Sequence, residues 1–320
     1  MVVRITRALL ILQLILAAGV SAVAGKLFHL GLVPAVMVGI GIVLLLRMLI
    51  TANNFWLTWY YGSVTPPEYR IGLWRAIRLF FGEYRSTMIS SSWTMPFFAF
   101  SRHIATDAKT LPVLLVHGYG CNSGYWHAMS KALTRAQITH WTVDLEPVTA
   151  SIDEYVQTIH EAIECLCQEC ETQQIVIVGH SMGGLAIRAY LRDHGSRRIA
   201  KVITLGTPHH GTALAQFGIG HNTRQMLWSI GEQEGLSSPW LRALASHESP
   251  AVYRLFVSIY SHHDNIIAPQ TSSHLLGARN IAHGGIGHVA LALHPTIQEE
   301  VVREIREVSQ NVSRWMRTGR

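Results

Sequence analysis

The sequence predicts an α/β fold, a mostly parallel sheet with helices on both faces, preceded by a pair of apolar helices. Three observations predict it. From about Pro96 onward, short apolar runs alternate with amphipathic helical patterns, which is typical of parallel sheets. One of these runs leads into a glycine-flanked serine. Near the N-terminus, two long uncharged stretches lie close together.

Composition divides the 320 residues into three segments. Residues 1–50 contain the two apolar stretches, and 51–95 form a juxtamembrane segment rich in aromatic side chains. Residues 96–320 form one α/β domain. Within it the strand pattern lapses at about 207–250, which we interpret as a small cap insertion over the strand ends. Structural packing alone would explain this insertion equally well.

The two apolar stretches are candidates for membrane spans. Ala8 to Gly25 and Gly31 to Leu46 carry no charge, and each is near the lower length limit for a spanning helix. Only a few residues, including Lys26, separate them, so a helical hairpin with both ends on one side is the simplest arrangement. Arg47 and three later arginines follow it, and the positive-inside rule then places both ends in the cytoplasm.

A cleaved signal peptide is the competing interpretation of the first stretch. Arg4 and Arg7 would form its basic region, and Ala22 to Ala24 would form its cleavage site. The catalytic domain would then lie outside, held by the second stretch alone. We favour the hairpin because the second stretch follows at once. Asn54 to Tyr61 is rich in Trp and Tyr, which indicates either an interfacial anchor or ordinary packing.

Composition also bears on partners and cofactors. Charged residues make up only 14% of the chain, which favours contact with a bilayer. The net charge of +6 comes from scattered arginines, so we expect no nucleic acid as a partner. The charge favours an anionic membrane surface, and a role in solubility alone would explain it equally well. Three cysteines, Cys165, Cys167 and Cys170, crowd one predicted helix without a fourth ligand, so we expect no metal. They weakly indicate a reducing compartment. We expect no cofactor, and the sequence leaves the oligomeric state open.

Short runs of branched apolar residues mark the buried strands. They are Pro112 to Val116, Ile138 to Leu145, Ile175 to Val178, Lys201 to Leu205 and Leu255 to Tyr260. Two helices begin with capping-box spacing, one at Ser151 with Glu154 and one near Thr296 with Glu299. Both carry a continuous apolar stripe, so each should cover a face of the sheet.

The strongest chemical signal is the run Gly179-His180-Ser181-Met182-Gly183-Gly184, which connects a buried strand to a helix. A sharp turn of this kind holds the serine in a strained conformation and leaves no space for side chains beside it. It presents the hydroxyl at a helix N-terminus, where developing negative charge is favoured. The pattern predicts that Ser181 is a nucleophile.

A serine hydroxyl needs a base, and the base needs a carboxylate to hold it. After a strand-turn-helix nucleophile these follow in the order acid, then histidine. Asp264 comes just past a strand end, and His288 ends a glycine-rich loop before the last helix, so we predict them as acid and base. His262, His263 and His283 are weaker candidates. Asp144 and Glu146 precede the serine, and we expect them to serve structure.

An oxyanion hole requires two backbone N–H groups aimed at the developing charge. Met182, directly after the nucleophile, would supply one. The second should come from the loop His117-Gly118-Tyr119-Gly120, and we choose Tyr119. Cys121 has no evident base and is expected to be a bystander.

Three motifs together resemble the bacterial triacylglycerol lipase and esterase family of the α/β-hydrolase superfamily. They are His117-Gly118-Tyr119-Gly120, Gly179-His180-Ser181-Met182-Gly183-Gly184 and Leu205-Gly206-Thr207-Pro208-His209-His210-Gly211-Thr212. The resemblance covers roughly residues 110 to 300 and continues in Gly277-Ala278-Arg279-Asn280 and Gly287-His288. It implies the α/β-hydrolase fold, the same triad and oxyanion residues, and acyl-ester substrates.

The expected activity is hydrolysis of carboxylic esters of lipids or acyl compounds by an enzyme in the bacterial inner membrane, with the catalytic domain facing the cytoplasm. The chain departs from the secreted members of the family in its double membrane run, and it shows no clear pair of aspartates for the calcium site that some carry. An acyltransferase would use the same acyl-enzyme, and a non-catalytic membrane-binding module is the alternative from another class.

Overall fold

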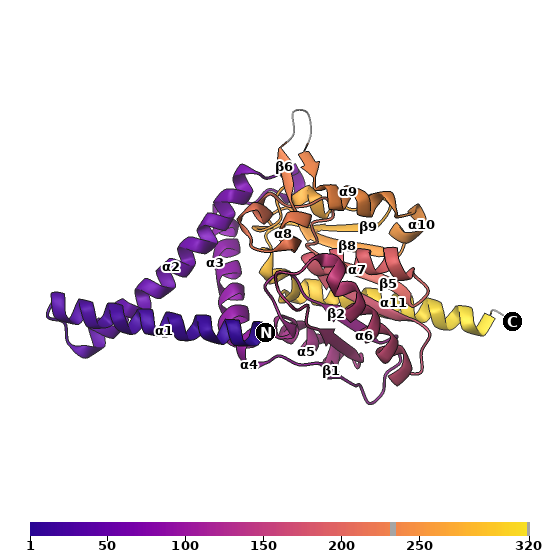
Figure 1. Ribbon diagram of the computed structural model, residues 1–320, viewed down its shortest axis with the longest axis horizontal. Helices are drawn as coiled ribbons and strands as arrows, with labels where there is room; N and C mark the ends of the chain where they lie inside the picture. The colour runs from indigo at the N-terminus through magenta and orange to yellow at the C-terminus, as the bar shows by residue number, and fades with distance from the viewer. Residues whose placement is uncertain (231–234, 319–320) are drawn as a thin grey trace.

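A computed structural model describes residues 1–230 and 235–318. The main sheet has seven strands in the order β1-β3-β2-β4-β5-β8-β9 (Figure 1). Their bounds are β1 Arg102–His103, β2 Val113–Val116, β3 His140–Val143, β4 Ile175–His180, β5 Ile199–Leu205, β8 Phe256–Ser261 and β9 Arg279–His283. Neighbouring strands are parallel, except that β1 pairs with β3 in the antiparallel direction. The predicted α/β architecture is confirmed.

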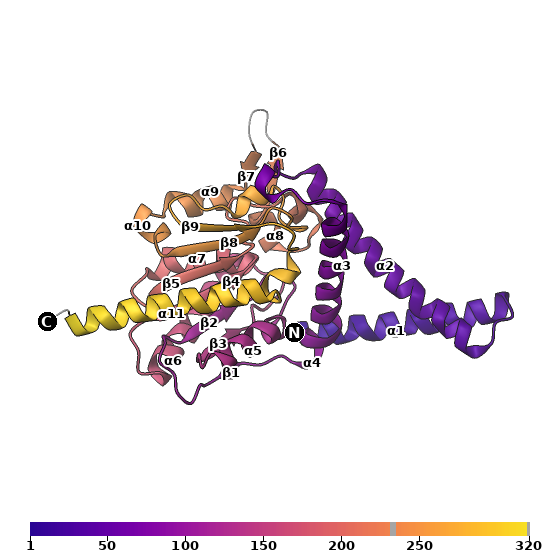
Figure 2. The same cartoon turned by 180° about the vertical axis from the view of Figure 1, so that it is seen from behind.

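Helices cover both faces of this sheet (Figures 1 and 2). On one face lie α5 (His127–Arg135) and α11 (Pro295–Thr318), and on the other lie α6 (Tyr155–Glu169) and α7 (Met182–His194). The strand residues alternate between two buried apolar clusters, so that Leu114 belongs to one and Val113 to the other. This double burial explains why the central strands are continuous apolar runs.

All five predicted strands form the centre of the sheet. The two outer strands were missed, because neither carries the signal of a buried strand. β1 is only two residues long, and β9 is half-exposed along most of its length. The capping box at Ser151 and Glu154 is present at η4 (Ile152–Glu154), which leads into α6. The last helix begins at Pro295, one residue before the predicted start.

The N-terminal stretch forms two long helices, α1 (Val2–Leu27) and α2 (Leu32–Tyr60), which project from one side of the α/β body and meet at a short turn far from it (Figure 1). Both are long and apolar enough to cross a membrane. The 26 residues of α1 span about 39 Å, against about 30 Å for a bilayer core. The helices cross closely at Gly39, where an added Cβ would overlap the Ala17 carbonyl.

A further helical segment stands between this hairpin and the body (Figure 2). It consists of α3 (Leu73–Ile89), a single π turn η2 (Ser90–Thr94) and α4 (Met95–Phe97), and is preceded by the short η1 (Pro67–Tyr69). The Arg47 guanidinium of α2 donates to Gln13 of α1 and to Ser91 and Ser92 of η2. These hydrogen bonds join α1, α2 and η2.

The predicted cap region consists of short elements. They are η5 (Ala213–Phe217), α8 (His221–Gln225), β6 (Trp228–Ile230), β7 (Gly235–Ser237), α9 (Pro239–Ser246) and α10 (Pro250–Tyr253). The strands β6 and β7 pair with each other in a separate antiparallel ribbon. Residues 231–234 of the predicted insertion lie outside the described residues. Three short 3-10 helices complete the body, namely η3 (Ser123–Trp126), η6 (Gln270–Ser273) and η7 (Val289–Ala292).

A buried ion pair fastens this region to the helix that follows the candidate nucleophile. Arg188 of α7 donates from Nε to Glu248 Oε1 at 2.8 Å and from Nη2 to Glu248 Oε2 at 2.5 Å. Its Nη1 donates to the His209 carbonyl at 2.8 Å. The two charged side chains are only 1% and 2% exposed, so neither charge has water as an alternative partner.

Replacing Glu248 with alanine should lower the free energy of unfolding by about 3 to 5 kcal/mol, because it leaves the Arg188 charge buried without its partner. Chemical denaturation of the wild type and the variant in detergent would measure this. The exposed Glu161→Ala is the matched control and should change stability by no more than about 0.5 kcal/mol. Equal stabilities for Glu248→Ala and the control would contradict the expectation.

Candidate active site

The candidate catalytic residues gather at one edge of the sheet because each directly follows the carboxyl end of a parallel strand. Ser181 follows β4, Asp264 lies three residues past β8, and His288 lies in the loop after β9. In the parallel register the ends of β8 and β9 are paired, Ser261 with His283. The structure therefore places Asp264 within hydrogen-bond distance of His288, and it places Ser181 at the same edge of the sheet.

Ser181 has a strained backbone, as the motif predicts. Its φ is +53° and its ψ is −128°, a region that L side chains rarely adopt. Its N–H donates to the Leu205 carbonyl of β5 at 2.9 Å. The helix α7 starts at the next residue, and an added Cβ on Gly183 would overlap the Val116 and His117 carbonyls. Glycine is thus required for the helix to approach β2 this closely.

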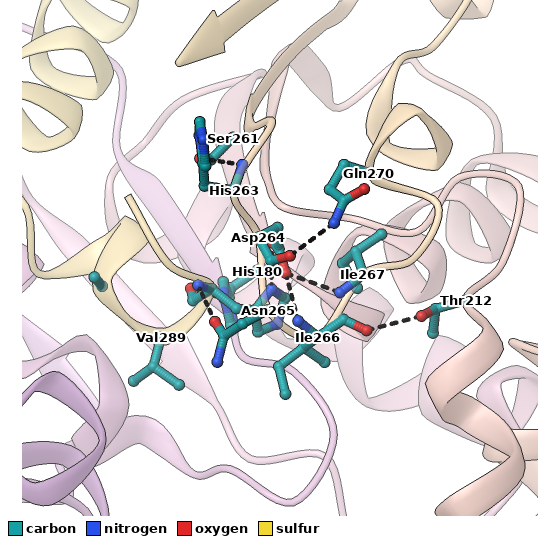
Figure 3. A network of polar contacts seen from close by, with 12 residues as sticks. His180, Thr212, Ser261, His263, Asp264, Asn265, Ile266, Ile267, Gln270 and Val289 are labelled. Atoms are coloured by element: carbon teal, nitrogen blue, oxygen red, sulfur yellow. Dashed lines mark hydrogen bonds and ion pairs between the residues drawn. The ribbon is translucent and has the colours of Figure 1, made fainter. Parts of the chain in front are cut away.

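Asp264 is 2% exposed, and both its side chain and its backbone carbonyl accept hydrogen bonds (Figure 3). Its Oδ1 accepts hydrogen bonds from the backbone N–H groups of Ile266 and Ile267, both at 2.8 Å. Its backbone carbonyl accepts a hydrogen bond from Gln270 at 3.1 Å. These contacts fix the carboxylate and leave Oδ2 directed at His288 Nδ1, 2.7 Å away.

His288 is 5% exposed, and its N–H donates to Asn265 Oδ1 at 3.0 Å. Burial opposes the charged imidazolium, but the Asp264 charge, its hydrogen bond and the charge of Glu83 outweigh this effect. The pKa of His288 therefore lies above the ordinary value of 6.5. With Nδ1 hydrogen-bonded to Asp264, Nε2 is the ring atom available to take a proton.

His180 packs its ring against His288, with 4.5 Å between the centroids. The His180 Nε2 lies 3.2 Å from the His288 carbonyl oxygen, so this nitrogen is the donor. Burial, and the neighbouring charge of His288, hold the pKa of His180 well below its ordinary value. A neutral His180 supports the backbone of His288 without competing for the proton.

The predicted oxyanion residues are close to Ser181 along the chain or in space, since Met182 is the next residue and Gly118, which precedes Tyr119, lies against the Ser181 side chain. Met182 is the first residue of α7, and the first amides of a helix have no acceptor within it. Tyr119 follows β2, and its hydroxyl donates to the Ile219 carbonyl at 2.8 Å and accepts from the Ile219 N–H at 3.0 Å. The same loop is held by His117, whose Nε2 accepts from the Leu145 N–H at 3.0 Å.

The weaker candidates have other contacts. His262 stacks on Tyr69, His263 accepts the Gly285 N–H, and His283 pairs with Glu300 of α11. Asp144 accepts the Ser123 N–H, and Glu146 accepts the Val2 N–H. Burial raises the pKa of the Cys121 thiol to about 12, which leaves it protonated at neutral pH. These contacts agree with structural roles.

Sequence reasoning missed the residues that support the triad from outside the motifs. Asn265 and Gln270 contact the acid and histidine loops, and Glu83 of α3 contacts the backbone after His288. One signal for Glu83 is present in the sequence, since it is the only acidic residue between Glu68 and Asp107. Nothing else in the sequence indicates that Glu83 lies near His288, because the two are 205 positions apart.

Comparison with known proteins agrees with the fold that carries this site. A model of the alpha/beta hydrolase fold matches residues 112–223, which run from β2 into the start of α8. A pimeloyl-(acyl-carrier protein) methyl ester esterase of Yersinia enterocolitica is 32% identical over 95 residues. The matched segment is 30% of this chain and 36% of that protein, so the chain matches little more than a third of the relative's length.

Two solved lipase structures share the architecture. The mature lipase of Bacillus licheniformis superimposes with a TM-score of 0.55 at 16% identity, covering 64% of this chain and 96% of that one. Lipase B of Aspergillus fumigatus gives a TM-score of 0.53 at 18% identity, covering 63% and 55%. The predicted resemblance is confirmed at the level of the fold, and the chain has the α/β-hydrolase fold.

Proposed function

We propose that this protein is a membrane-anchored serine hydrolase that cleaves carboxylic esters of lipids or acyl compounds. One observation carries the proposal. A serine on a strained strand-to-helix turn lies at the same sheet edge as a buried histidine whose Nδ1 is 2.7 Å from a fixed carboxylate. This combination of nucleophile, base and orienting acid serves acyl transfer.

In the proposed reaction the Ser181 Oγ attacks the ester carbonyl while His288 Nε2 takes its proton. Asp264 holds Nδ1–H and stabilises the imidazolium that forms. The backbone N–H groups of Met182 and Tyr119 stabilise the negative charge on the former carbonyl oxygen. His288 then gives its proton to the leaving alcohol, and an acyl-enzyme remains on Ser181. Water, deprotonated by His288, releases the carboxylic acid and restores the serine.

The N-terminal hairpin supports a membrane location. Large apolar side chains on it face outward, including Leu14, Ile15, Leu32 and Met37, each more than 60% exposed in the structure. Apolar surface of this extent needs a bilayer to cover it. At the body end of α2, Trp56 and Trp59 are 58% and 77% exposed, as suits the headgroup level.

The contacts of α1 favour a retained hairpin over a cleaved signal peptide. Val2 is 2% exposed, its N–H donates to Glu146, and the Arg7 Nε donates to the Pro96 carbonyl at 2.9 Å. Removing α1 would expose these partners. A retained hairpin keeps both ends on one side, and the arginines after it favour the cytoplasmic side of the bacterial inner membrane.

The end of α2 also touches the catalytic edge. Gln270, which donates to the Asp264 carbonyl at 3.1 Å, also donates to the Thr58 carbonyl of α2 at 3.4 Å and accepts the Ser63 N–H just after α2 at 3.0 Å. A cavity of about 160 Å³ lies between Phe55, Trp59 and the loop that carries Asp264. In the proposed membrane orientation the catalytic edge lies near the bilayer surface, which suits a lipid or acyl-ester substrate.

Replacing Ser181 with alanine should abolish labelling by a fluorophosphonate probe and lower the hydrolysis of p-nitrophenyl esters by about 10⁴-fold or more, because no other group replaces the nucleophile. Membranes containing equal amounts of each protein would be compared, with the exposed Ser246→Ala as control. A folded wild type that takes no label and cleaves no ester would refute the hydrolase proposal.

The acidic side of the pH profile should report His288. The base acts when neutral, so kcat/KM should fall as the pH drops through the His288 pKa. Because that pKa is raised, the midpoint should lie above 6.5. Asp264→Asn removes the main charge that raises it, so the midpoint should move to lower pH and kcat should fall by about 10⁴-fold. An unchanged midpoint in this variant would exclude the assigned pair.

Membrane topology can be measured with the protein's own cysteine. Cys165 is exposed on α6, and a His29→Cys, Cys165→Ser double variant would report the hairpin turn. In intact spheroplasts an impermeant maleimide should label position 29 and should reach Cys165 only after lysis. The Cys165→Ser variant is the background control. Labelling of Cys165 before lysis would place the catalytic domain outside, as the signal-peptide interpretation requires.

A further inference from the structure

A second buried carboxylate lies beside the candidate base, and no sequence motif includes it. Glu83 is on α3, the helix that stands between the apolar hairpin and the α/β body. Its side chain reaches into the body and is only 1% exposed, although it carries a carboxylate. Burying such a group costs free energy unless hydrogen bonds and a nearby positive charge compensate.

The hydrogen-bond partners of Glu83 are the two amides that follow His288. Its Oε1 accepts the Val289 N–H at 2.8 Å, and its Oε2 accepts the Ala290 N–H at 3.0 Å. These amides begin the 3-10 helix η7, of which His288 is the N-cap residue. Glu83 therefore satisfies, from a distant helix, the donors that a helix start leaves without partners.

The residue before His288 is a glycine, which leaves space for this contact. A Cβ added at Gly287 would overlap the Glu83 carboxylate, so only glycine leaves room for it. The backbone from Gly287 to Ala290 thus packs against the carboxylate, and His288 belongs to this segment. The orientation of the ring depends on two carboxylates, Asp264 through Nδ1 and Glu83 through the backbone.

Glu83 is negative when ionised and His288 is positive when protonated, so each favours the charged form of the other. Burial raises the pKa of Glu83 to about 7, while the two N–H donors and the charge of His288 favour the carboxylate and that of Asp264 disfavours it. His180, whose pKa burial holds well below its ordinary value, and Tyr125, whose pKa burial raises, are uncharged at neutral pH. Arg78, Arg85 and His294 line the cavity beside Glu83. The carboxylates that stabilise a protonated His288 are therefore Asp264 and the ionised form of Glu83.

We propose that Glu83 is a positioning residue for the base, supplied by the membrane-proximal helix α3, which holds the His288 loop and stabilises the imidazolium formed during acyl transfer. This proposal rests on the proposed hydrolase function. It makes the N-terminal helices part of the catalytic architecture as well as an anchor, since Glu83 of α3 binds the two amides that follow His288, and Gln270 links α2 to the acid loop.

The test compares Glu83→Gln with wild type in full-length protein reconstituted in detergent micelles. Glutamine keeps the shape but loses the charge and one of two acceptors. We expect kcat for a p-nitrophenyl ester to fall about tenfold, the worth of one charged hydrogen bond, with KM changed less than about twofold. The acidic midpoint of kcat/KM should move to lower pH, because less negative charge faces His288. Glu83→Asp keeps the charge and should restore the midpoint.

The matched control is Glu304→Gln, which removes another carboxylate that is 1% exposed, on α11 and paired with Arg279 at the start of β9. It should leave the acidic midpoint unchanged. If Glu83→Gln does not fold, Gly287→Ala gives a second route, since its Cβ displaces the carboxylate and should shift the midpoint in the same direction.

Two results would overturn the proposal while leaving the hydrolase function intact. One is a Glu83→Gln protein with wild-type kcat. The other is a loss of kcat with an unmoved acidic midpoint, as a merely structural role would give. Fluorophosphonate labelling of the wild type separates these from failure of the hydrolase proposal, because an unlabelled wild type removes the reaction that both variants are meant to change.

Discussion

The positive φ of Ser181 is the constraint on which the rest of the candidate site depends. A side-chain-bearing residue adopts this conformation only when its surroundings hold it there. Here β4 fixes the chain before the turn, α7 fixes it after the turn, and the Leu205 carbonyl accepts the Ser181 N–H. The close packing of α7 on β2 at Gly183 then decides where the hydroxyl lies relative to the neighbouring loops.

The parallel sheet places the other loops of the candidate site next to the Ser181 turn. Because the strands run in one direction, the loops that follow β2, β4, β8 and β9 all emerge at one edge. In the loops that carry Asp264 and His288, backbone N–H groups take part in the hydrogen bonds that hold the functional residue. The Asp264 carboxylate is fixed by Ile266 and Ile267, and the His288 backbone by Asn265.

The N-terminal helices change how this architecture is understood. A membrane anchor joined by a flexible linker would make no contact with the active site and would not affect it. In this chain α3 and the end of α2 pack against the acid and histidine loops, and the N-terminus of α1 pairs with Glu146 after β3. The proposed anchor and the proposed active site therefore share contacts, and changes in one should reach the other.

Local sequence patterns were enough to predict several features of the fold and of the candidate site. Continuous apolar runs identified the five buried central strands, the spacing of Ser151 and Glu154 identified a helix start, and glycine spacing identified Ser181 as a strained turn. The order of residues then predicted Asp264 and His288, which the structure places 2.7 Å apart. Local steric rules and hydrophobic periodicity carry this information along the chain itself.

The distant residues that support these groups are known only from the folded structure. The edge strands β1 and β9 lack the buried pattern and form because neighbouring strands offer hydrogen bonds. The ion pair of Arg188 with Glu248 and the contact of Glu83 with the His288 loop join residues 60 or more positions apart. No local pattern encodes such pairings, because their free energy comes from burial and charge compensation that exist only once the chain has folded.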